Sequence, residues 1–208
     1  MRNLLLAVVL LGCSLAMSRA IAQPGQVSES EFTVLAAGMA RITEDFERFP
    51  IGAIASPLQL RNGIFTGTPS IAAPWCIPSR CLTVGLAPGT FSAFPNGTVL
   101  WSTRLIPVAS TGDYIVDVVG RSGTQRFSLT DVPFSIDGSF VGFHDPLGLL
   151  QVTFSLPTAP FGANYSLDNV VVAIANERPV GVPSLSTGGV LLLALAVLGL
   201  AGLTLRRV

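Results

Sequence analysis

Short apolar runs, interrupted every few residues by glycine, proline, asparagine or aspartate, fill most of the chain between residues 41 and 175. Several runs alternate apolar with polar residues and are rich in β-branched and aromatic side chains, as at 114–119 and 152–156. Such runs are typical of half-buried strands, and pairs such as Asn62-Gly63 and Asn96-Gly97 are typical of the turns between them. The pattern predicts an all-β fold, an antiparallel sandwich or barrel.

The runs predict strands at nine places, over residues 41–49, 56–61, 81–86, 98–103, 113–119, 125–132, 134–143, 149–156 and 165–175. Only residues 29–40 have a helical pattern, and this stretch is short and contains Gly38. We therefore place a β-sandwich ectodomain at residues 41–175, preceded by an N-terminal segment at 23–40.

Residues 1–22 have the pattern of a secretory signal peptide. Arg2 precedes an apolar run at 4–11, and Ala-Ile-Ala at 20–22 is a small-residue cleavage site, which predicts a mature chain beginning at Gln23. The alternative is a lipoprotein box at Leu10-Leu11-Gly12-Cys13, which would make Cys13 a lipidated N-terminus.

The C-terminus carries a second apolar segment. Residues 188–205 contain no charge and are followed by Arg206 and Arg207. Eighteen residues of helix reach about 27 Å, enough to cross a hydrocarbon core, and the two arginines favour the cytoplasmic side. We expect a transmembrane helix here, joined to the ectodomain by an exposed linker at 176–181 that is part of a stretch rich in proline and glycine.

This tail resembles the bacterial C-terminal sorting signals of the PEP-CTERM type, in particular the IPTL-CTERM variant. The resemblance rests on a short motif ahead of the helix and on the terminal arginine pair, at Val182, Pro183, Ser184, Leu185, Arg206 and Arg207. Gly188-Gly189 stands where the family usually has an aromatic residue. The resemblance implies a Gram-negative source and a transient inner-membrane anchor, which an exosortase-like enzyme processes near the motif, as with other cleaved hydrophobic tails.

The ectodomain is also similar to those of PEP-CTERM proteins, through residues 45–52 (DFERFPIG), 139–156 and 165–172. The resemblance implies a jelly-roll sandwich akin to carbohydrate-binding modules. It also places Glu47 and Asp168 where such folds can hold a structural Ca²⁺, an ion that takes six to eight oxygens. The alternative is that both are solvated or arginine-paired residues of a strand face.

Two cysteines, Cys76 and Cys81, remain after removal of the signal peptide. An exported chain favours a disulfide between them, closing a small loop. Half of a zinc site is the alternative, but it needs further ligands, and the only histidine of the chain, His144, is remote in sequence.

We expect no catalytic residues. The chain has no Gly-rich phosphate loop, paired-histidine metalloprotease motif or Gly-x-Ser-x-Gly elbow. His144-Asp145 precedes Pro146 and is interpreted as a turn rather than a catalytic dyad. The acidic cluster of Glu44, Asp45 and Glu47 is interpreted as a solvated strand face, although a spatial pair of carboxylates for glycoside hydrolysis stays open.

Four aromatic residues, Trp75, Trp101, Tyr114 and Tyr165, could stack on sugars or fill the core. Aromatic residues on strands are expected in the core. Trp75 lies in a loop beside Cys76 and is the candidate for ligand contact.

Residues 23–183 hold eight arginines, no lysine and twelve acidic residues, a net charge of −4, which argues against nucleic-acid binding. We predict an exported cell-envelope or extracellular-matrix protein with a non-enzymatic structural or adhesive role, anchored transiently in the inner membrane and then found at the cell surface or outside. The alternative is a carbohydrate-binding module for extracellular polysaccharide, and an enzyme acting on glycans comes third.

Overall fold

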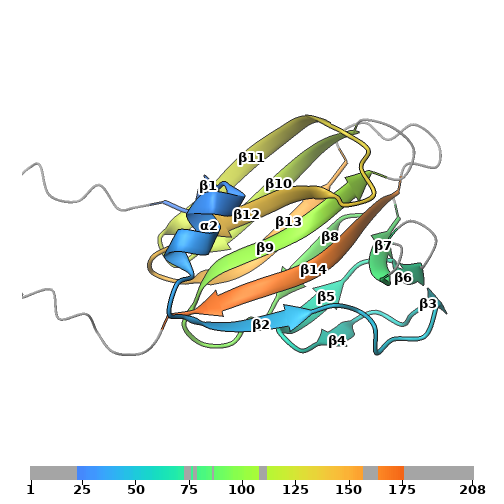
Figure 1. The fold of residues 1–208 in the computed structure, drawn as a ribbon, viewed down its shortest axis with the longest axis horizontal. Coiled ribbons are helices and arrows are strands. Elements are labelled where there is room, and N and C mark those ends of the chain that lie inside the picture. Colours follow the sequence, from blue (N-terminus) through green and yellow to red (C-terminus); the bar gives the residue numbers. More distant parts are fainter. Residues whose placement is uncertain are drawn as a thin grey trace, which may run out of the picture. The chain divides into compact units, whose positions relative to one another are not determined.

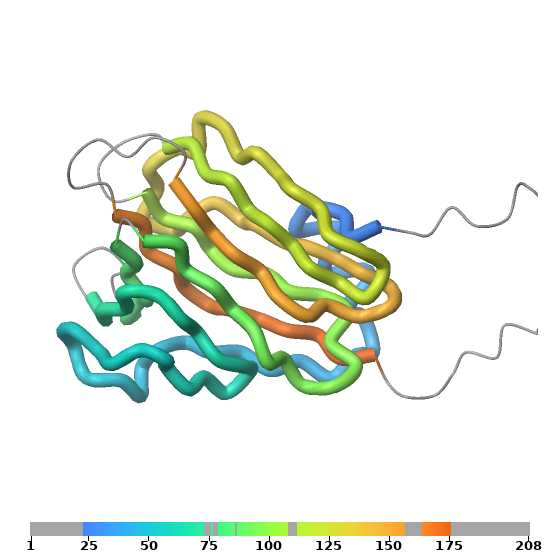
Figure 2. Tube along the Cα trace, turned by 180° about the vertical axis from the view of Figure 1, so that it is seen from behind, coloured from blue at the N-terminus to red at the C-terminus, as the bar shows by residue number. Residues whose placement is uncertain are grey.

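The computed structural model describes residues 23–72, 76, 79–85, 87–107, 112–156 and 164–175. Within these residues the chain forms fourteen strands and one helix, and the strands build two antiparallel sheets. Figures 1 and 2 show the two sheets from opposite sides, one in front of the other. The predicted all-β antiparallel sandwich is confirmed.

The first sheet, sheet A, carries both the first and the last strand of the described chain. Its order is β1 (Gly25–Val27), β12 (Ser139–His144), β9 (Thr98–Pro107), β14 (Tyr165–Ile174), β7 (Cys81–Val84), β6 (Pro69–Ala72) and β3 (Gly52–Ala53), and β2 (Ala40–Glu44) also pairs with β14.

The second sheet, sheet B, has six strands. Its order is β11 (Gly123–Val132), β10 (Gly112–Gly120), β13 (Leu149–Ser155), β8 (Gly89–Ser92), β5 (Gly63–Thr66) and β4 (Leu58–Leu60). Figure 2 shows this sheet from its outer side, where no described helix or strand crosses it.

The core lies between the sheets and is built from the inward-facing residues of both. Trp101 of β9 is fully buried at its centre, with ring centroids 5.3 Å from Phe91, 5.8 Å from Phe154 and 6.1 Å from Phe143. Aromatic rings bury large apolar areas, so this cluster of rings from both sheets is a main source of stability.

The helix α2 (Glu29–Leu35) begins with a capping box: the Ser28 side chain accepts from the Glu31 backbone N–H, and the Glu31 carboxylate accepts from the Ser28 N–H at 2.8 Å. Its buried Phe32 packs edge-on against Phe140 of β12, so α2 lies on the outer face of sheet A. The helix is shorter than the predicted 29–40, because a turn follows it in which Gly38 has a φ of +76°.

Other boundaries also differ from expectation. Residues 23–40 are part of the sandwich, because they contribute β1 and α2. The strands β1, β3, β5, β6 and β8 lie outside the nine predicted ranges. The run at 134–143 becomes a strand only at Ser139, because Asp137-Gly138 forms a turn in which Gly138 has a φ of +68°.

Three predicted segments lie outside the described residues: the signal peptide at 1–22, the linker at 176–181 and the sorting signal at 182–208. Across the described ranges, no helix has the length and apolar character needed to span a membrane.

Candidate functional site

The last strand, β14, changes its neighbour halfway along. Residues 165–167 pair with β7, whereas residues 170–174 pair with β2. At the change, the register with β9 shifts between Asp168 and Val171, and Asn169 has a φ of +51°. This irregularity is a β-bulge, a feature that re-aims side chains, and it carries Asp168.

The Asp168 carboxylate is largely buried and hydrogen-bonded. It accepts from the Ser79 hydroxyl at 3.1 Å, and from the Asn169 backbone N–H at 2.8 Å and side-chain amide at 3.0 Å. Burial raises the pKa of Asp168, the negative charges of Glu47 and Asp45 add to this rise, and the bonds from Ser79 and Asn169 oppose it without cancelling it.

Glu47 is held by Arg80. The Arg80 backbone N–H donates to the Glu47 carboxylate at 2.6 Å, and the Arg80 guanidinium donates to the main-chain oxygens of Glu47 at 3.0 Å and Phe49 at 2.6 Å. The two charged groups also lie 3.8 Å apart. Glu47 is therefore arginine-paired, one of the alternatives left open by the sequence.

Ser79 and Arg80 both belong to a small loop closed by the predicted disulfide between Cys76 and Cys81, which is confirmed. The two cysteines pack on Ile106, a residue of β9. The loop thus brings Cys76, Cys81, Glu47 and Asp168 together on one part of the molecule. Trp75 lies outside the described residues, so its role in ligand contact stays a prediction.

The donors around Glu47 and Asp168 bear on the predicted calcium. Both carboxylates already accept hydrogen bonds, and the cationic Arg80 lies beside Glu47. In the described part of the chain, no three acidic, histidine or cysteine residues gather in a way that could hold a metal. These residues fit a set of structural hydrogen bonds between neighbouring segments better than they fit a calcium site. Calcium binding stays a prediction.

The expectation that Glu44 is solvated is wrong. Glu44 was interpreted as part of a solvated strand face, but its side chain is fully buried. Its carboxylate accepts from the Arg48 guanidinium and from the Arg61 backbone N–H, each at 2.8 Å. A buried charge is stable only with such partners, and the alternating sequence around Glu44 did not reveal them.

The turn predicted at His144-Asp145 is found only from Asp145 onward. His144 ends β12, and Asp145 begins the turn to β13. The buried Asp145 carboxylate accepts from the Ser122 N–H at 3.1 Å, the Ser122 hydroxyl at 2.8 Å and the Leu147 N–H at 2.8 Å. Burial lowers the pKa of His144, against a smaller opposing effect of Asp145. The turn is therefore a structural hydrogen-bonded unit.

The strand aromatics belong to the core. Trp101, Tyr114 and Tyr165 are at most 2 % exposed, so none of them offers a ring face to a sugar. Burial raises the pKa of Tyr114 to about 12. The expectation that strand aromatics fill the core is confirmed.

Polar side chains line up across the uncovered outer face of sheet B. Cross-strand pairing joins one residue from each of five neighbouring strands into a row, which we call the threonine row: Thr66, Thr90, Thr153, Asp117 and Arg126. Neighbouring strands lie about 4.8 Å apart, so the row spans roughly 19 Å.

Side chains of the threonine row contact one another. The hydroxyls of Thr90 and Thr153 lie 3.1 Å apart, and the Gln151 amide donates to Thr153 at 3.0 Å. At the end of the row, Arg126 makes a two-pronged ion pair with Asp117, at 2.7 and 2.9 Å.

A second row runs parallel to the first and mixes polar with apolar residues: Ile64, Ser92, Gln151, Val119 and Thr124. Sequence reasoning missed both rows. The alternation along each strand was visible, but the alignment of five strands depends on sheet order and register, which no local signal supplies.

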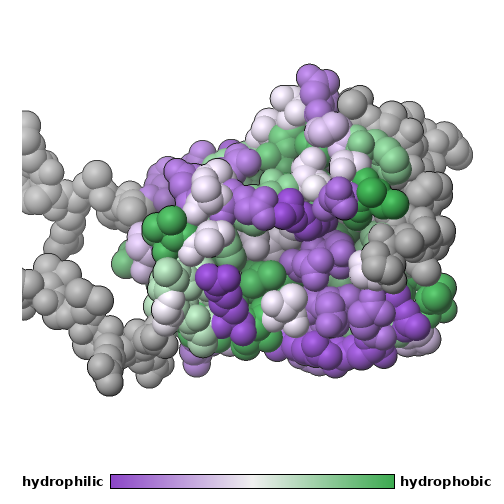
Figure 3. Space-filling model, viewed as in Figure 1, coloured by the Kyte–Doolittle hydropathy of each residue, from purple (hydrophilic) through white to green (hydrophobic). Residues whose placement is uncertain are grey.

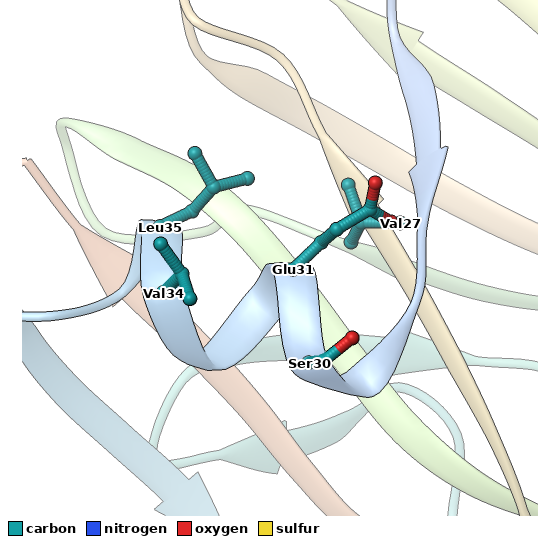
Figure 4. A pocket seen from close by; sticks show the side chains of 5 residues that line it. All are labelled: Val27, Ser30, Glu31, Val34 and Leu35. Atoms are coloured by element: carbon teal, nitrogen blue, oxygen red, sulfur yellow. The ribbon is translucent and has the colours of Figure 1, made fainter.

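Two hollows adjoin α2 on the other side of the molecule, which Figure 3 shows as a mixture of hydrophilic and hydrophobic patches. One, seen in Figure 4, lies between α2 and β1 and is lined by Val27, Ser30, Glu31, Val34 and Leu35. The other is a groove of about 260 Å³ between α2 and strands β2, β9, β12 and β14.

Comparison with known proteins gives no family. No family model matches the chain, and no curated protein matches it. Among solved structures, it is similar to the family 11 carbohydrate-binding module of the cellulosomal cellulase Lic26A-Cel5E of Clostridium thermocellum, at 12 % identity and a TM-score of 0.41 over 68 % of this chain and 99 % of that one.

Two further solved structures show similar values. The CBM22-1 xylan-binding domain of Paenibacillus barcinonensis Xyn10C matches at 15 % identity and a TM-score of 0.38, over 64 % of this chain and 93 % of that one. An exo-β-agarase matches at 12 % identity and a TM-score of 0.39, over 66 % of this chain and 25 % of that one. At these values the similarity does not indicate what this chain binds.

Proposed function

We propose that this chain is an exported, non-enzymatic surface or matrix protein whose sandwich binds extracellular polysaccharide through the outer face of sheet B. The threonine row carries the proposal. Hydroxyl and charged groups follow one another across five strands on a face that no described element covers.

The chemistry of this face fits a glycan chain lying across the strands. The strand spacing of about 4.8 Å is close to the length of one pyranose unit, so successive side chains can meet successive sugars. Thr90, Thr153 and Gln151 offer donors and acceptors to sugar hydroxyls. Ile64 and Val119 of the second row offer apolar contact to the C–H faces of the rings.

Export and sorting complete the proposal. The signal peptide at 1–22 and the tail at 182–208 support delivery to the cell surface through a transient inner-membrane anchor. The intact mass of the protein released from its native cells tests this part. We expect a form beginning at Gln23 and ending near Val182–Leu185, whereas a mass that retains Arg207 and is found only in membranes would mean a permanent anchor.

An enzyme is the second candidate, because Asp168 has a raised pKa and lies near the charge of Glu47, a combination known from glycoside hydrolases. Against it, Ser79, Asn169 and Arg80 occupy these carboxylates. We expect incubation of the full chain with soluble glucan or xylan to release no reducing ends. Release that Asp168→Asn abolishes would establish an enzyme.

The proposal requires no cofactor. The melting temperature is expected to be the same with a chelator and with millimolar Ca²⁺, because Arg80 already neutralises Glu47. A clear fall with the chelator would establish a structural calcium.

A further inference from the structure

The groove between α2 and the outer face of sheet A is a second polar site, on the side of the sandwich away from the threonine row. Ser102 of β9, Val171 of β14 and Thr43 of β2 line it, and Phe140 of β12 contributes an aromatic ring. Its volume of about 260 Å³ admits a single sugar unit. It is therefore a small site with both polar and apolar walls, as ligand sites commonly are.

Two arginines and one acid contribute the charges of the groove. Arg104 is paired with Glu29 of α2, and its guanidinium lies 5.8 Å from the ring centre of Phe140. Arg41 donates to the Ala36 carbonyl at 3.3 Å and forms no ion pair with any described residue. The groove thus holds one uncompensated positive charge.

Ser102 gives the second observation. The residue is only 3 % exposed, yet its side chain lines the groove, and its hydroxyl has no hydrogen-bond partner within the described ranges. Ser102 Oγ is not among the enclosed unpaired side-chain atoms of the described chain, which are Trp101 Nε1 and Tyr165 OH, so this oxygen remains accessible from the groove. An accessible hydroxyl without a protein partner in the described chain is open to bonding by a ligand or solvent.

We propose that this groove binds the uronic-acid unit of an acidic polysaccharide, with Arg41 pairing with the carboxylate and Ser102 and Thr43 bonding the ring hydroxyls. That the ligand is a polysaccharide rather than a free sugar rests on the proposed function. The uncompensated charge of Arg41 favours an anionic sugar over a neutral one. With binding faces on both sides, one sandwich can join two polysaccharide chains.

Non-specific electrostatic attraction between the domain and an acidic polysaccharide would not produce such binding. Residues 23–183 carry a net charge of −4, so the domain as a whole repels a polyanion. Binding of an acidic polymer therefore requires a local cationic site, which is what Arg41 supplies.

The test compares polygalacturonate with a neutral β-glucan, using the full chain in a mild non-ionic detergent and affinity electrophoresis at low ionic strength. Arg41→Gln should weaken polygalacturonate binding about tenfold, the size of one lost charged hydrogen bond. Ser102→Ala should weaken it severalfold. Arg121→Gln is the matched control, because Arg121 is an exposed arginine with no ion pair in the described structure, and its removal should change binding less than twofold.

The outcomes are distinct. Equal losses with Arg41→Gln and Arg121→Gln, or no binding of polygalacturonate by the wild type, would overturn the groove assignment. If the groove assignment fails but the wild type and both variants still bind neutral β-glucan equally, the proposed function stands. If the wild type does not bind neutral β-glucan, the proposed function is refuted, whatever the result for the groove. Competition by free galacturonate distinguishes recognition of a single sugar from recognition of the polymer. The melting temperature of each variant shows whether it remains folded.

Discussion

The hydroxyl oxygens of Thr90 and Thr153 lie 3.1 Å apart across the neighbouring strands β8 and β13, at the centre of the threonine row. Both residues point away from the core, on the opposite face from their buried neighbours Phe91 and Phe154. This contact is a hydrogen bond on a partly exposed face, where it adds little to stability.

The first prediction concerns that contact. Thr90→Val with Thr153→Val removes both hydroxyls but keeps the side-chain shape and a high strand propensity. The free energy of unfolding in urea should change by less than about 1 kcal/mol, because an exposed hydrogen bond contributes about that much. A loss of several kcal/mol would show that these hydroxyls are structural.

The second prediction concerns the disulfide. Reduction, or Cys76→Ala with Cys81→Ala, frees the loop that carries Ser79 and Arg80. Because the loop is short, opening it should lower the free energy of unfolding by about 2 kcal/mol. Urea unfolding with and without reductant measures it, and a reduced protein that does not fold at all would contradict the account, since the main core is built without the loop.

The third prediction is a pH dependence. The raised pKa of Asp168 means that the folded state holds this proton more tightly than the unfolded state, whose pKa is near the ordinary 3.8. The resulting stabilisation is fully present below 3.8 and is lost as the pH rises through the higher pKa of the folded state. Asp168→Asn removes this dependence, so the free energy of unfolding of the variant should rise relative to that of the wild type as the pH increases above about 3.8. If the free energy of unfolding of the wild type instead rises relative to that of the variant as the pH increases, the charged Asp168 carboxylate is stabilising.

The fourth prediction tests the turn around Asp145. A Cβ at Gly120 would lie 1.8 Å from the Asp145 carboxylate, so Gly120→Ala must displace that group from Ser122 and Leu147. We expect a loss of about 3 kcal/mol or more, because a buried charge loses its partners. Gly25→Ala is the control, since a Cβ there meets nothing within 4 Å, and it should be nearly neutral. Equal effects of the two substitutions would contradict this view of the turn.

The sequence predicts two of the longer strands closely, whereas β9 runs to Pro107, four residues beyond its expected end at 103. β10 and β13 lie within about one residue of their expected positions, because alternation and β-branched residues act locally. Short strands such as Gly63–Thr66 and Gly89–Ser92 were missed, since their glycines resemble turns and only pairing with neighbours makes them strands.

Features of the candidate sites are likewise predictable where they depend on local sequence and not where they depend on distant contacts. The disulfide follows from two cysteines in an exported chain, and the proximity of Glu47 and Asp168 came from a resemblance. The burial of Glu44, the bonding of Arg80 to Glu47 and the alignment of Thr66 with Arg126 depend on contacts between distant segments. No local pattern encodes such contacts, and they emerge only from the sheet order.

Retention on a neutral β-glucan gel, measured for the wild type and for Thr90→Val with Thr153→Val, tests whether the threonine row binds a glycan. We expect the wild type to be retarded and the double variant, which should be equally stable, to show at least about fivefold weaker affinity, as expected for the loss of one or two hydrogen bonds. Thr130→Val, on the same face but outside the row, should behave as the wild type. Retardation that the double variant retains in full would contradict a glycan site on the outer face of sheet B.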